Sequence, residues 1–275
     1  MKINIGGFTF KDSTDICKST IYFCQLECRS PPKLLSRSTM SDPKNTSSSG
    51  ILIIDKPLGI SSMRAVEMVR RGMGGLRTGH AGTLDPLATG VLIIAVGSAT
   101  RSINMLMDLE KQYETTIDLS ATTPTLDSES DRVEITRSTP PPSADTVAQA
   151  LKQFIGDYPQ IPPAFSAKQI NGRRAYDMAR SGEEVVLAPR MVRVHAMSLL
   201  SFTWPVVRLA IRCDKGFYVR SLAHDLGAVL GGGGYCTAIR RTAIGPYLVR
   251  DAIELKQEAL PNPSQLLALH PVVAR

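Results

Sequence analysis

The chain has 275 residues, a mass of 29.8 kDa and a formal net charge of +7 at pH 7. Its 43% of hydrophobic and 21% of charged residues are typical of a globular protein and exclude a fibrous repeat or global disorder. The longest apolar stretch, Val91–Val96, is far shorter than the roughly 20 residues of a membrane-spanning helix, so we expect no such helix. The basic charge favours a polyanionic partner such as nucleic acid, although many basic proteins simply carry a solvated positive face.

The five cysteines are distributed unevenly along the chain. They include no Cys-x-x-Cys pair, so the sequence predicts neither a structural zinc site nor a disulfide framework. An odd number of thiols fits a reducing compartment, and we therefore expect a cytoplasmic location.

Residues 1–50 differ from the rest of the chain and are rich in Ser and Thr over residues 36–50, so we expect a poorly ordered extension. Charged residues interrupt any apolar core after Phe10, which disfavours a secretory signal. An organelle presequence is a second alternative, and the acidic residues of the segment argue against it. The third alternative is that translation starts at Met40, and we favour this interpretation.

After this extension, the β-branched run Ile51–Asp55 predicts a buried strand that ends at a Lys-Pro pair. Ser61 or Ser62 then caps an amphipathic helix that ends near Gly72. A glycine-rich loop follows and leads to a second predicted strand, Val91–Val96.

Apolar and polar residues alternate over residues 112–119, which predicts a strand with Tyr113 on its buried face. Ser143 caps a helix with an apolar stripe at helical spacing, and Gly156 ends it. Further strands are expected near Val185–Leu187, Val192–Ala196 and Val206–Ile211. A strand-like segment at residues 217–220 then leads into a helix that ends in a run of four glycines, residues 231–234.

Strands and helices that are grouped without strict alternation favour a mixed α/β (α+β) domain. We expect a largely antiparallel central sheet flanked by helices over residues 51–250. The run of four glycines lacks the Lys-Ser or Lys-Thr pair of a nucleotide-binding loop, and we interpret it as a turn.

The strongest candidate for a catalytic segment is the loop over residues 79–90, Gly-His-Ala-Gly-Thr-Leu-Asp-Pro-Leu-Ala-Thr-Gly. Its glycines and its proline favour a tight loop that another backbone can approach closely. Asp85 precedes Pro86, which biases Asp85 towards an extended conformation and could hold its carboxylate in a fixed pose. By residue type alone, however, an aspartate before a proline is more often a turn former than a catalyst.

An ordered series of segments resembles one known family. The loop from His80 to Gly90 closely resembles the catalytic loop of the TruB-type tRNA pseudouridine synthases. Other similar segments are Ile54–Ser62, Lys111–Tyr113, Pro162–Tyr176 and Lys215–Leu222. The resemblance covers most of residues 51–250 and implies a pseudouridine synthase fold. It also implies an isomerase that converts the T-loop uridine of tRNA, position 55, to pseudouridine without a metal or an organic cofactor.

The resemblance assigns the catalytic roles by position. Asp85 would act as nucleophile or base in cleavage of the N-glycosidic bond, after which the uracil rotates and is rejoined through carbon. Attack on the ribose, attack on the uracil and removal of a ribose proton all remain open for it. Arg220 would pair with Asp85 and keep it ionised. Tyr113 would stack on the extruded base and take part in proton transfer from carbon, and Tyr218 would line the same pocket, although either could be a core aromatic.

The remaining implied residues concern RNA binding. His80 would fill the gap that the extruded nucleotide leaves, and it has no second His or Cys at the spacing of a metal site. Lys56, Arg64 and Arg77 are expected to contact phosphates, although each could be solvated surface. The implied partner is the T-arm of tRNA, bound by a monomer with no protein partner and no membrane.

Two features depart from the family pattern. Ser120 and Ser130 stand at or near positions where the family usually has glycine, which puts the shape of that loop in doubt. Only about 25 residues follow Arg250, so we expect a short tail over residues 251–275 in place of the C-terminal RNA-binding module of many bacterial members. This favours a stand-alone enzyme over the RNA-guided synthases of ribonucleoprotein particles.

Two alternative functions belong to other classes. A non-catalytic tRNA-binding or tRNA-folding chaperone of the same fold would bind tRNA without forming product. A carboxylate-based glycosidase would need two carboxyl groups about 5 to 9 Å apart. No second acidic residue accompanies Asp85 in its loop.

Overall fold

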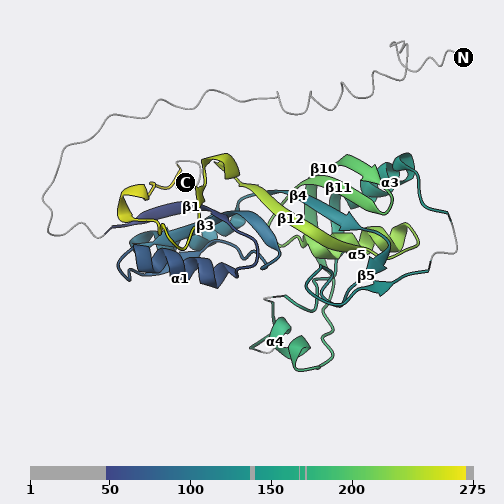
Figure 1. Ribbon diagram of the computed structural model, residues 1–275, viewed down its shortest axis with the longest axis horizontal. Coiled ribbons are helices and arrows are strands. Elements are labelled where there is room, and N and C mark those ends of the chain that lie inside the picture. The colour runs from purple at the N-terminus through teal and green to yellow at the C-terminus, as the bar shows by residue number, and fades with distance from the viewer. Residues whose placement is uncertain (1–47, 137–139, 167, 171, 271–275) are drawn as a thin grey trace, which may run out of the picture. The chain divides into compact units, whose positions relative to one another are not determined.

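Ten strands of the described residues form one mixed sheet, which is the frame of the fold (Figure 1). The computed structural model describes residues 48–136, 140–166, 168–170 and 172–270, so the expectations for residues 1–47, including the start at Met40, lie outside the described residues. The strand order is β14-β1-β3-β12-β4-β11-β10-β7, with β2 beside β3 and β13 beside β12. Only the β1–β14 and β3–β12 pairs within it are parallel. The predicted mixed class with a largely antiparallel sheet is therefore confirmed.

The strands of this sheet are β1 (Gly50–Lys56), β2 (Thr78–His80), β3 (Ala88–Val96), β4 (Lys111–Asp118), β7 (Gly156–Gln160), β10 (Arg190–Thr203), β11 (Val206–Cys213), β12 (Tyr235–Ile244), β13 (Tyr247–Leu248) and β14 (Ile253–Glu254). Two small hairpins lie outside it, β5 (Ala121–Thr122) with β6 (Val133–Glu134) and β8 (Gln169–Ile170) with β9 (Arg173–Arg174). The helices are α1 (Ser62–Gly72), α2 (Ile103–Asp108), α3 (Ala144–Leu151), α4 (Ala175–Arg180) and α5 (Val219–Val229). Short 3-10 turns occupy Gly97–Ser102, Lys152–Phe154, Val249–Asp251 and Pro263–Gln265.

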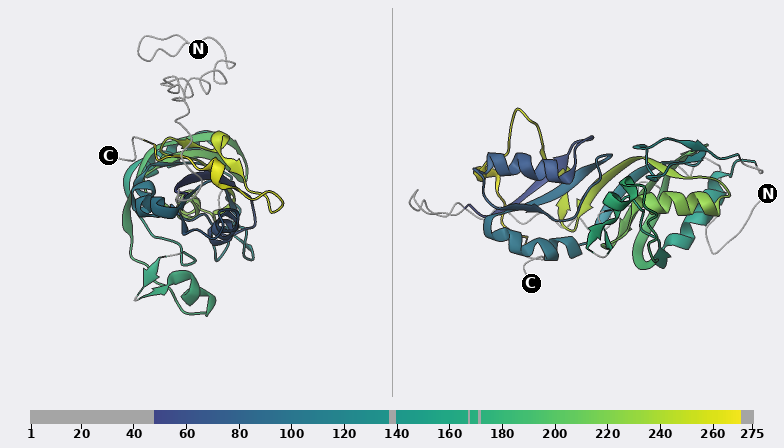
Figure 2. Two further views of the ribbon diagram at one scale, coloured as in Figure 1. Left: turned by 90° about the vertical axis from the view of Figure 1, so that its left-hand side faces the viewer. Right: turned by 90° about the horizontal axis from the view of Figure 1, so that it is seen from below.

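The helices cover both faces of the sheet. Successive side chains of a strand point to opposite faces, and β1 carries apolar side chains on both of them. Leu52 of β1 packs in the cluster that contains Val69 of α1 and the buried faces of α3 and α5. Ile53, the next residue of β1, packs instead in the cluster that contains Leu106 of α2. Figures 1 and 2 show α1 alongside β1 and β3, α5 alongside β12 and β4, and α4 standing away from the sheet.

Several elements form where the sequence predicts them. The strand at Ile51–Asp55 and the helix after it are confirmed as β1 and α1. Ser61 is the N-cap of α1, and its hydroxyl accepts a hydrogen bond from the Arg64 amide at 3.1 Å. Ser143 caps α3, and the buried residues of α3 lie on its predicted apolar stripe.

Two expectations about local structure are wrong, and one strand of the sheet was not predicted. Val185–Leu187 forms no strand, since it pairs with no neighbour, and Val186 is 80% exposed. Residues 217–218 form an irregular link into α5, so the strand expected there is absent. Strand β12 was not predicted, because Arg240 and Arg241 interrupt its apolar pattern.

Strand β12 nevertheless lies in the middle of the sheet, parallel to β3 and antiparallel to β4. In its register, Arg241 is opposite Gly90 of β3 and opposite Tyr113 of β4. Strand β12 therefore joins the strand that follows the glycine-rich loop to the strand that carries the predicted active-site tyrosine.

Residues after Arg250 extend the same sheet. Strand β14 pairs with β1, and Ile51 and Leu267 exchange two backbone hydrogen bonds of 2.9 Å each. These contacts satisfy backbone groups of β1 that would otherwise form an open edge. The boundary predicted after Arg250 consequently does not coincide with a break in the packing.

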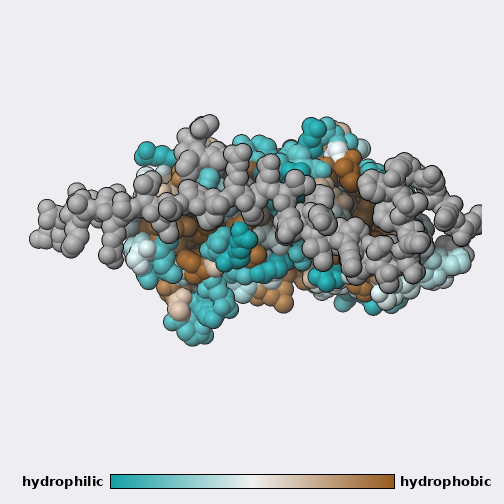
Figure 3. All heavy atoms as spheres, turned by 90° about the horizontal axis from the view of Figure 1, so that it is seen from above, coloured by the Kyte–Doolittle hydropathy of each residue, from teal (hydrophilic) through white to brown (hydrophobic). Residues whose placement is uncertain are grey.

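Among the described residues, no helix is both long and apolar enough to cross a membrane. On the face drawn in Figure 3, hydrophilic and hydrophobic residues are interspersed.

A buried serine connects α1 to the glycine-rich loop and provides a test of the fold. The Ser62 hydroxyl donates to the Leu84 carbonyl at 2.9 Å and accepts from the Leu84 amide at 2.8 Å. Ser62→Ala leaves both groups without a partner, and we expect it to lower the free energy of unfolding by about 1–3 kcal/mol. Urea denaturation measures this loss. Ser128→Ala, at an exposed position, is the control, and equal midpoints for the two variants would contradict the prediction.

Candidate active site

The loop between β2 and β3 holds Asp85 in a turn that is fixed from several sides. The Ala88 amide donates to the Asp85 carbonyl at 3.0 Å, and the Gly59 amide donates to the Pro86 carbonyl at 2.9 Å. On the other side of Asp85, both backbone groups of Leu84 are hydrogen-bonded to the Ser62 hydroxyl. The turn at Asp85 is therefore held by the segment that leads into α1 as well as by its own hydrogen bonds.

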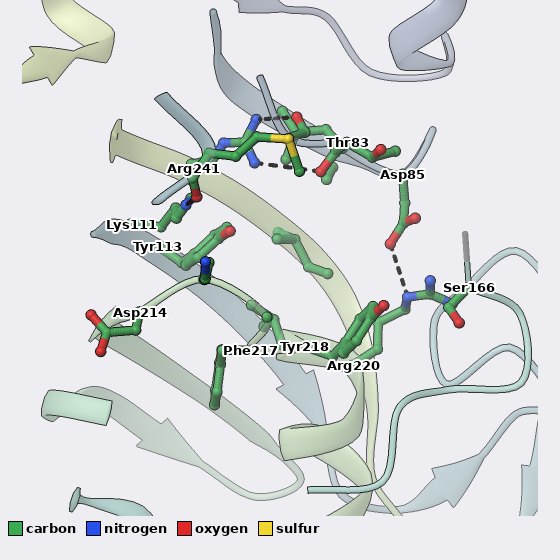
Figure 4. Close-up of a pocket in the computed structure, with 18 of the residues that line it drawn as sticks. Thr83, Asp85, Lys111, Tyr113, Ser166, Asp214, Phe217, Tyr218, Arg220 and Arg241 are labelled. Atoms are coloured by element: carbon green, nitrogen blue, oxygen red, sulfur yellow. Dashed lines mark hydrogen bonds and ion pairs between the residues drawn. The ribbon is translucent and has the colours of Figure 1, made fainter. Parts of the chain in front are cut away.

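The Asp85 carboxylate forms an ion pair with Arg220, as the resemblance implied. Arg220 Nε lies 2.9 Å from Asp85 Oδ2, and Figure 4 shows the pair at one side of the pocket. Arg220 comes from the first turn of α5 and is 4% exposed, whereas the Asp85 side chain is 37% exposed. The carboxylate thus faces the pocket and the guanidinium lies behind it.

Arg220 has a second carboxylate partner that sequence reasoning did not assign to the site. Asp127 Oδ2 lies 3.4 Å from Arg220 Nη1, and the Asp127 side chain is 1% exposed. The guanidinium also donates to the Thr125 carbonyl at 2.8 Å and to the Phe165 carbonyl at 2.9 Å. Because buried charges are costly unless paired and hydrogen-bonded, this set of partners fixes both the position and the charge of Arg220.

The loop that carries Asp127 takes its shape partly from the two serines that depart from the family pattern. Ser130 Oγ accepts from the Thr125 amide at 3.1 Å and lies 2.7 Å from the Thr125 hydroxyl. Ser120 Oγ lies within hydrogen-bond distance of Asp118 and accepts from Arg132 at 2.9 Å. Both serines therefore make hydrogen bonds that glycine could not make, and Ser130 supports the residue whose carbonyl binds Arg220.

Asp85 and Arg220 line a pocket of about 280 Å³ together with Tyr113 and Tyr218. This volume is near the lower end for small-molecule sites and suits a single nucleobase with its sugar. In Figure 4, Asp85 and Arg220 lie on one side of the pocket, and Tyr113 lies across from them beside Arg241. The structure thus brings together the three residues that the resemblance assigned to catalysis. The first and the last of them, Asp85 and Arg220, are 135 positions apart in the sequence.

Tyr218 is held at both its backbone and its ring. The buried amide of Gln160 accepts from the Tyr218 amide at 2.8 Å and donates to the Tyr218 carbonyl at 3.0 Å. The Arg190 guanidinium lies over the Tyr218 ring, 4.9 Å from its centroid, in cation–π geometry. Tyr218 is therefore a rigid wall of the pocket.

Burial is the main influence on the ionisation of the pocket. It raises the pKa of Asp85 above its ordinary value, whereas the positive charges of Arg220 and Lys56 lower it and the charge of Asp127 raises it further. Burial also raises the pKa of the Tyr113 phenol, and Arg241 opposes that shift. The cations around Asp85 therefore oppose the effect of burial and favour its ionised form.

Lys56 does not fit the phosphate contact expected for it, because it is fully buried. Its ammonium group donates to the Ile60 carbonyl at 2.8 Å, the Pro57 carbonyl at 2.9 Å and the Pro86 carbonyl at 3.4 Å. The role of this residue is to join the turn after β1 to the residue that follows Asp85.

The other residues expected to bind RNA have different environments. Arg64 is exposed on α1 and forms an ion pair with Glu67 at 3.4 Å. Arg77 is exposed before β2, and His80 is half-buried at the end of β2, beside the strand that follows the catalytic loop. Neither Arg64 nor Arg77 lines the pocket of Asp85, so any contact with RNA lies outside it.

Arg241 is one of the pocket residues that sequence reasoning missed. It is 2% exposed, and its guanidinium donates to the carbonyls of Val91 at 2.7 Å, Gly82 at 3.1 Å and Thr83 at 3.4 Å. The resemblance extended to residue 250 and so included this arginine. The local pattern did not mark it as buried, because two adjacent arginines interrupt the apolar run.

One cluster of the described residues could hold a metal ion. The ligand atoms of Glu110, His195 and Asp214 lie within 4.8 Å of one another, at the rim of the pocket to which Asp214 contributes. His195 Nε2 is 2.8 Å from Asp214 and 3.4 Å from Glu110, and Glu110 is also paired with Arg212 at 2.9 Å. The same distances fit an imidazole that bridges two carboxylates with no metal ion between them.

The buried Lys56 provides a pH-dependent test of the site. Burial lowers its pKa to about 8, from 10.5, and Lys111 is lowered similarly. Between pH 8 and pH 9 the unfolded chain holds more protons than the folded chain at these lysines, so the free energy of unfolding rises with pH, by up to about 1.4 kcal/mol per pH unit for each lysine. Above pH 9 the raised pKa values of the buried Cys213 and Cys236 act in the opposite direction, so the test is confined to the lower interval. In Lys56→Met we expect roughly half of this slope, since one of the two lysines is gone.

Urea denaturation at several pH values across this interval measures the slope. Lys152→Met, at an exposed position after α3, is the matched control and should keep the slope of the unmodified chain. The same slope in Lys56→Met and in the unmodified chain would contradict the assignment.

The chain is similar in sequence to a known protein family and to several curated proteins. Residues 70–219 match the family model described as TruB family pseudouridylate synthase, N-terminal domain. The tRNA pseudouridine synthase B of Aromatoleum aromaticum is 42% identical over 226 residues, which are 82% of this chain and 73% of that protein. The protein of the same name from Pseudomonas paraeruginosa is 44% identical over 208 residues, or 76% of this chain and 68% of that protein. That from Opitutus terrae is 42% identical over 224 residues, or 81% of this chain and 92% of that protein.

Solved structures share the fold. A chain of a Cbf5-Nop10-Gar1 complex is similar with a TM-score of 0.59 and 27% identity, covering 75% of this chain and 52% of that one. A chain of an H/ACA RNP bound to a substrate RNA containing 2′-deoxyuridine gives a TM-score of 0.56 and 25% identity, covering 76% and 51%. The present chain thus spans about half the length of these two chains. With the family match over residues 70–219 and the identity to its curated relatives, the chain belongs to the TruB family of pseudouridylate synthases.

Proposed function

We propose that this chain is a tRNA pseudouridine synthase that converts the T-loop uridine to pseudouridine. Membership of the family and the names of the relatives support this function. The observation that carries it is the Asp85–Arg220 ion pair at 2.9 Å, which faces a nucleobase-sized pocket with Tyr113 on its other side. A single carboxylate held by a buried cation opposite an aromatic ring suits cleavage of a glycosidic bond to a flat base.

The proposed reaction is balanced within the substrate. The bond from C1′ of the ribose to N1 of uracil breaks, the base rotates, and a bond from C1′ to C5 forms. The proton of C5 is lost to solvent and N1 gains a proton, so no oxidant or reductant is consumed and no organic cofactor is required.

Asp85 acts at the glycosidic bond in this proposal. Attack on the ribose, attack on the uracil and removal of a ribose proton all need the ionised carboxylate, so each depends on the charge of Arg220. Arg220 also lies behind the carboxylate, which leaves the free side of Asp85 directed towards the substrate. Asp85 is accordingly the reacting group and Arg220 the group that keeps it charged and oriented.

Aromatic side chains receive the extruded base. Tyr113 and Tyr218 line the pocket, and stacking on their rings offsets part of the few kcal/mol that extrusion of a base costs. Tyr113 also takes part in removal of the C5 proton. His80 fills the space that the base leaves in the RNA loop, and Arg64 and Arg77 contact phosphates of the T-arm, all within a cytoplasmic monomer.

Two alternatives have less support. A non-catalytic tRNA chaperone would have no need for Asp85, Tyr113 and Arg220 around one pocket. A glycosidase would need a second carboxyl group facing the bond. Asp127 is fully buried against Arg220 and does not line the pocket, and Asp214, which does line it, is paired with His195 at 2.8 Å.

The proposed function predicts tritium release from a tRNA transcript labelled at C5 of its uridines, with the product mapped to the T-loop. We expect Asp85→Asn to bind the transcript and to release no tritium, because the amide cannot act as nucleophile or base. Tight binding without release by the unmodified chain would instead establish the chaperone. Release by both proteins would retain the enzyme and exclude Asp85 as the reacting group.

The ionisation of Asp85 predicts the pH dependence of the reaction. Since its pKa is raised above the ordinary 3.8, the rate constant at saturating RNA should fall as the pH drops through that raised value. Asp127→Asn removes a negative charge that raises the pKa, so this acid limb should move to lower pH. Lys56→Met removes a positive charge that lowers the pKa, so the limb should move to higher pH.

Single-turnover rates over a pH series measure both shifts. Asp131→Asn, at an exposed position in the same loop as Asp127, is the control and should leave the acid limb unchanged. Shifts of Asp127→Asn and Lys56→Met in the same direction would exclude Asp85 as the group that titrates.

A further inference from the structure

The buried guanidinium of Arg241 contacts the catalytic loop at both of its ends. It donates to the carbonyls of Gly82 and Thr83, which precede Asp85, and to that of Val91, which follows the loop in β3. Figure 4 shows this side chain between the loop segment at Thr83 and the ring of Tyr113. A single side chain thus holds together the two ends of the segment from which Asp85 projects.

The backbone of Arg241 is as closely constrained as its side chain. Arg241 is opposite Gly90, the last residue of the catalytic loop, and a Cβ atom added at Gly90 would lie 2.2 Å from the Arg241 carbonyl oxygen. Gly90 also has a φ of +99°, a conformation that L side chains rarely adopt. The loop motif therefore ends in glycine because β12 approaches it at this point.

The opposite edge of β12 faces the catalytic tyrosine. Arg241 is the register partner of Tyr113 in β4, Figure 4 shows the two side chains beside one another, and the positive charge of Arg241 opposes the rise in the pKa of the Tyr113 phenol. Among the described residues, no carboxylate lies within 4.0 Å of the Arg241 guanidinium, and its hydrogen bonds go to backbone carbonyls. An unneutralised cation next to a buried phenol reduces the cost of forming a phenolate there.

We propose that Arg241 is a positioning residue for the isomerisation, which sets the separation and the orientation of Asp85 and Tyr113 across the bound uridine. This inference rests on the proposed function, because it assigns Arg241 a part in the steps that these two residues perform. Arg241 acts through the loop on one side and through the phenol on the other, and it does not touch the substrate. Misplacement of reacting groups by about 1 Å can cost a hundredfold in rate, so a clamp at this point is kinetically significant.

The test compares Arg241→Lys and Arg241→Met with Arg240→Met. Arg240 is the neighbouring residue of β12, and its side chain is 42% exposed and paired with Asp55 at 2.6 Å, so it serves as the matched control. Single-turnover pseudouridine formation at saturating tRNA transcript, transcript affinity and thermal unfolding are measured for each variant. We expect the two Arg241 variants to lose about a hundredfold in rate constant while the dissociation constant changes by less than about threefold. Arg241→Lys should be the faster of the two, since it keeps the charge.

A double-mutant cycle with Tyr113→Phe separates positioning from a general loss of stability. If Arg241 acts in part through the phenol, the combined effect of Arg241→Lys and Tyr113→Phe is smaller than the product of the separate effects. A merely structural arginine would reduce the active fraction and leave the rate constant of folded protein unchanged. Tritium release from C5 is followed in the same experiments.

Several outcomes would overturn the inference. They are a rate constant of Arg241→Lys within about threefold of the unmodified chain, a loss that lies wholly in transcript affinity, strictly multiplicative effects with Tyr113→Phe, or failure of both Arg241 variants to fold. None of these affects the proposed function while the unmodified chain forms pseudouridine. An inactive unmodified chain would overturn the function itself.

Discussion

The buried guanidinium of Arg220 is the interaction on which the site depends. It pairs with Asp85 and Asp127, and it donates hydrogen bonds to the carbonyls of Thr125 and Phe165. A side chain without the planar, multiple donors of a guanidinium could not make all of these contacts. These partners come from three separate loops, and the arginine comes from the first turn of α5. Because a buried cation is unfavourable unless its donors are satisfied, the three loops are held around α5 by contacts that also favour the charged form of Asp85.

The catalytic loop is held in a similar way from its other sides. Lys56 donates to the carbonyl that follows Asp85, Ser62 binds both backbone groups of Leu84, and Arg241 binds carbonyls at both ends of the loop. Each anchor is buried and comes from a different element, namely β1, α1 and β12. These anchors fix the backbone on both sides of Asp85, so the position of its carboxylate is set by the fold.

Local signals in the sequence predicted most of the elements around the site. The Ser61 cap, the β-branched run of β1 and the alternation in β4 are short-range patterns that burial of one face enforces, and the structure contains all three. The resemblance over residues 51–250 supplied the pairing of Asp85 with Arg220, which no local pattern could have shown. It failed at Lys56, because residue type alone does not distinguish a buried ammonium group from a phosphate contact on the surface.

The sequence by itself determined the loop that carries Asp85 and the strand that carries Tyr113, because glycines and hydrophobic periodicity act over a few neighbouring positions. Arg220 lies in the first turn of α5 and not in the strand-like segment expected at residues 217–220. Only the tertiary structure decided how those elements meet. Strand β12 was not predicted because Arg241 occupies a buried position in it. A buried arginine needs acceptors for its donors, and for Arg241 these are backbone carbonyls of residues distant in the chain. Those carbonyls lie about 150 residues away in the chain. The position of β12 between β3 and β4 therefore depends on contacts between residues that are distant in the sequence.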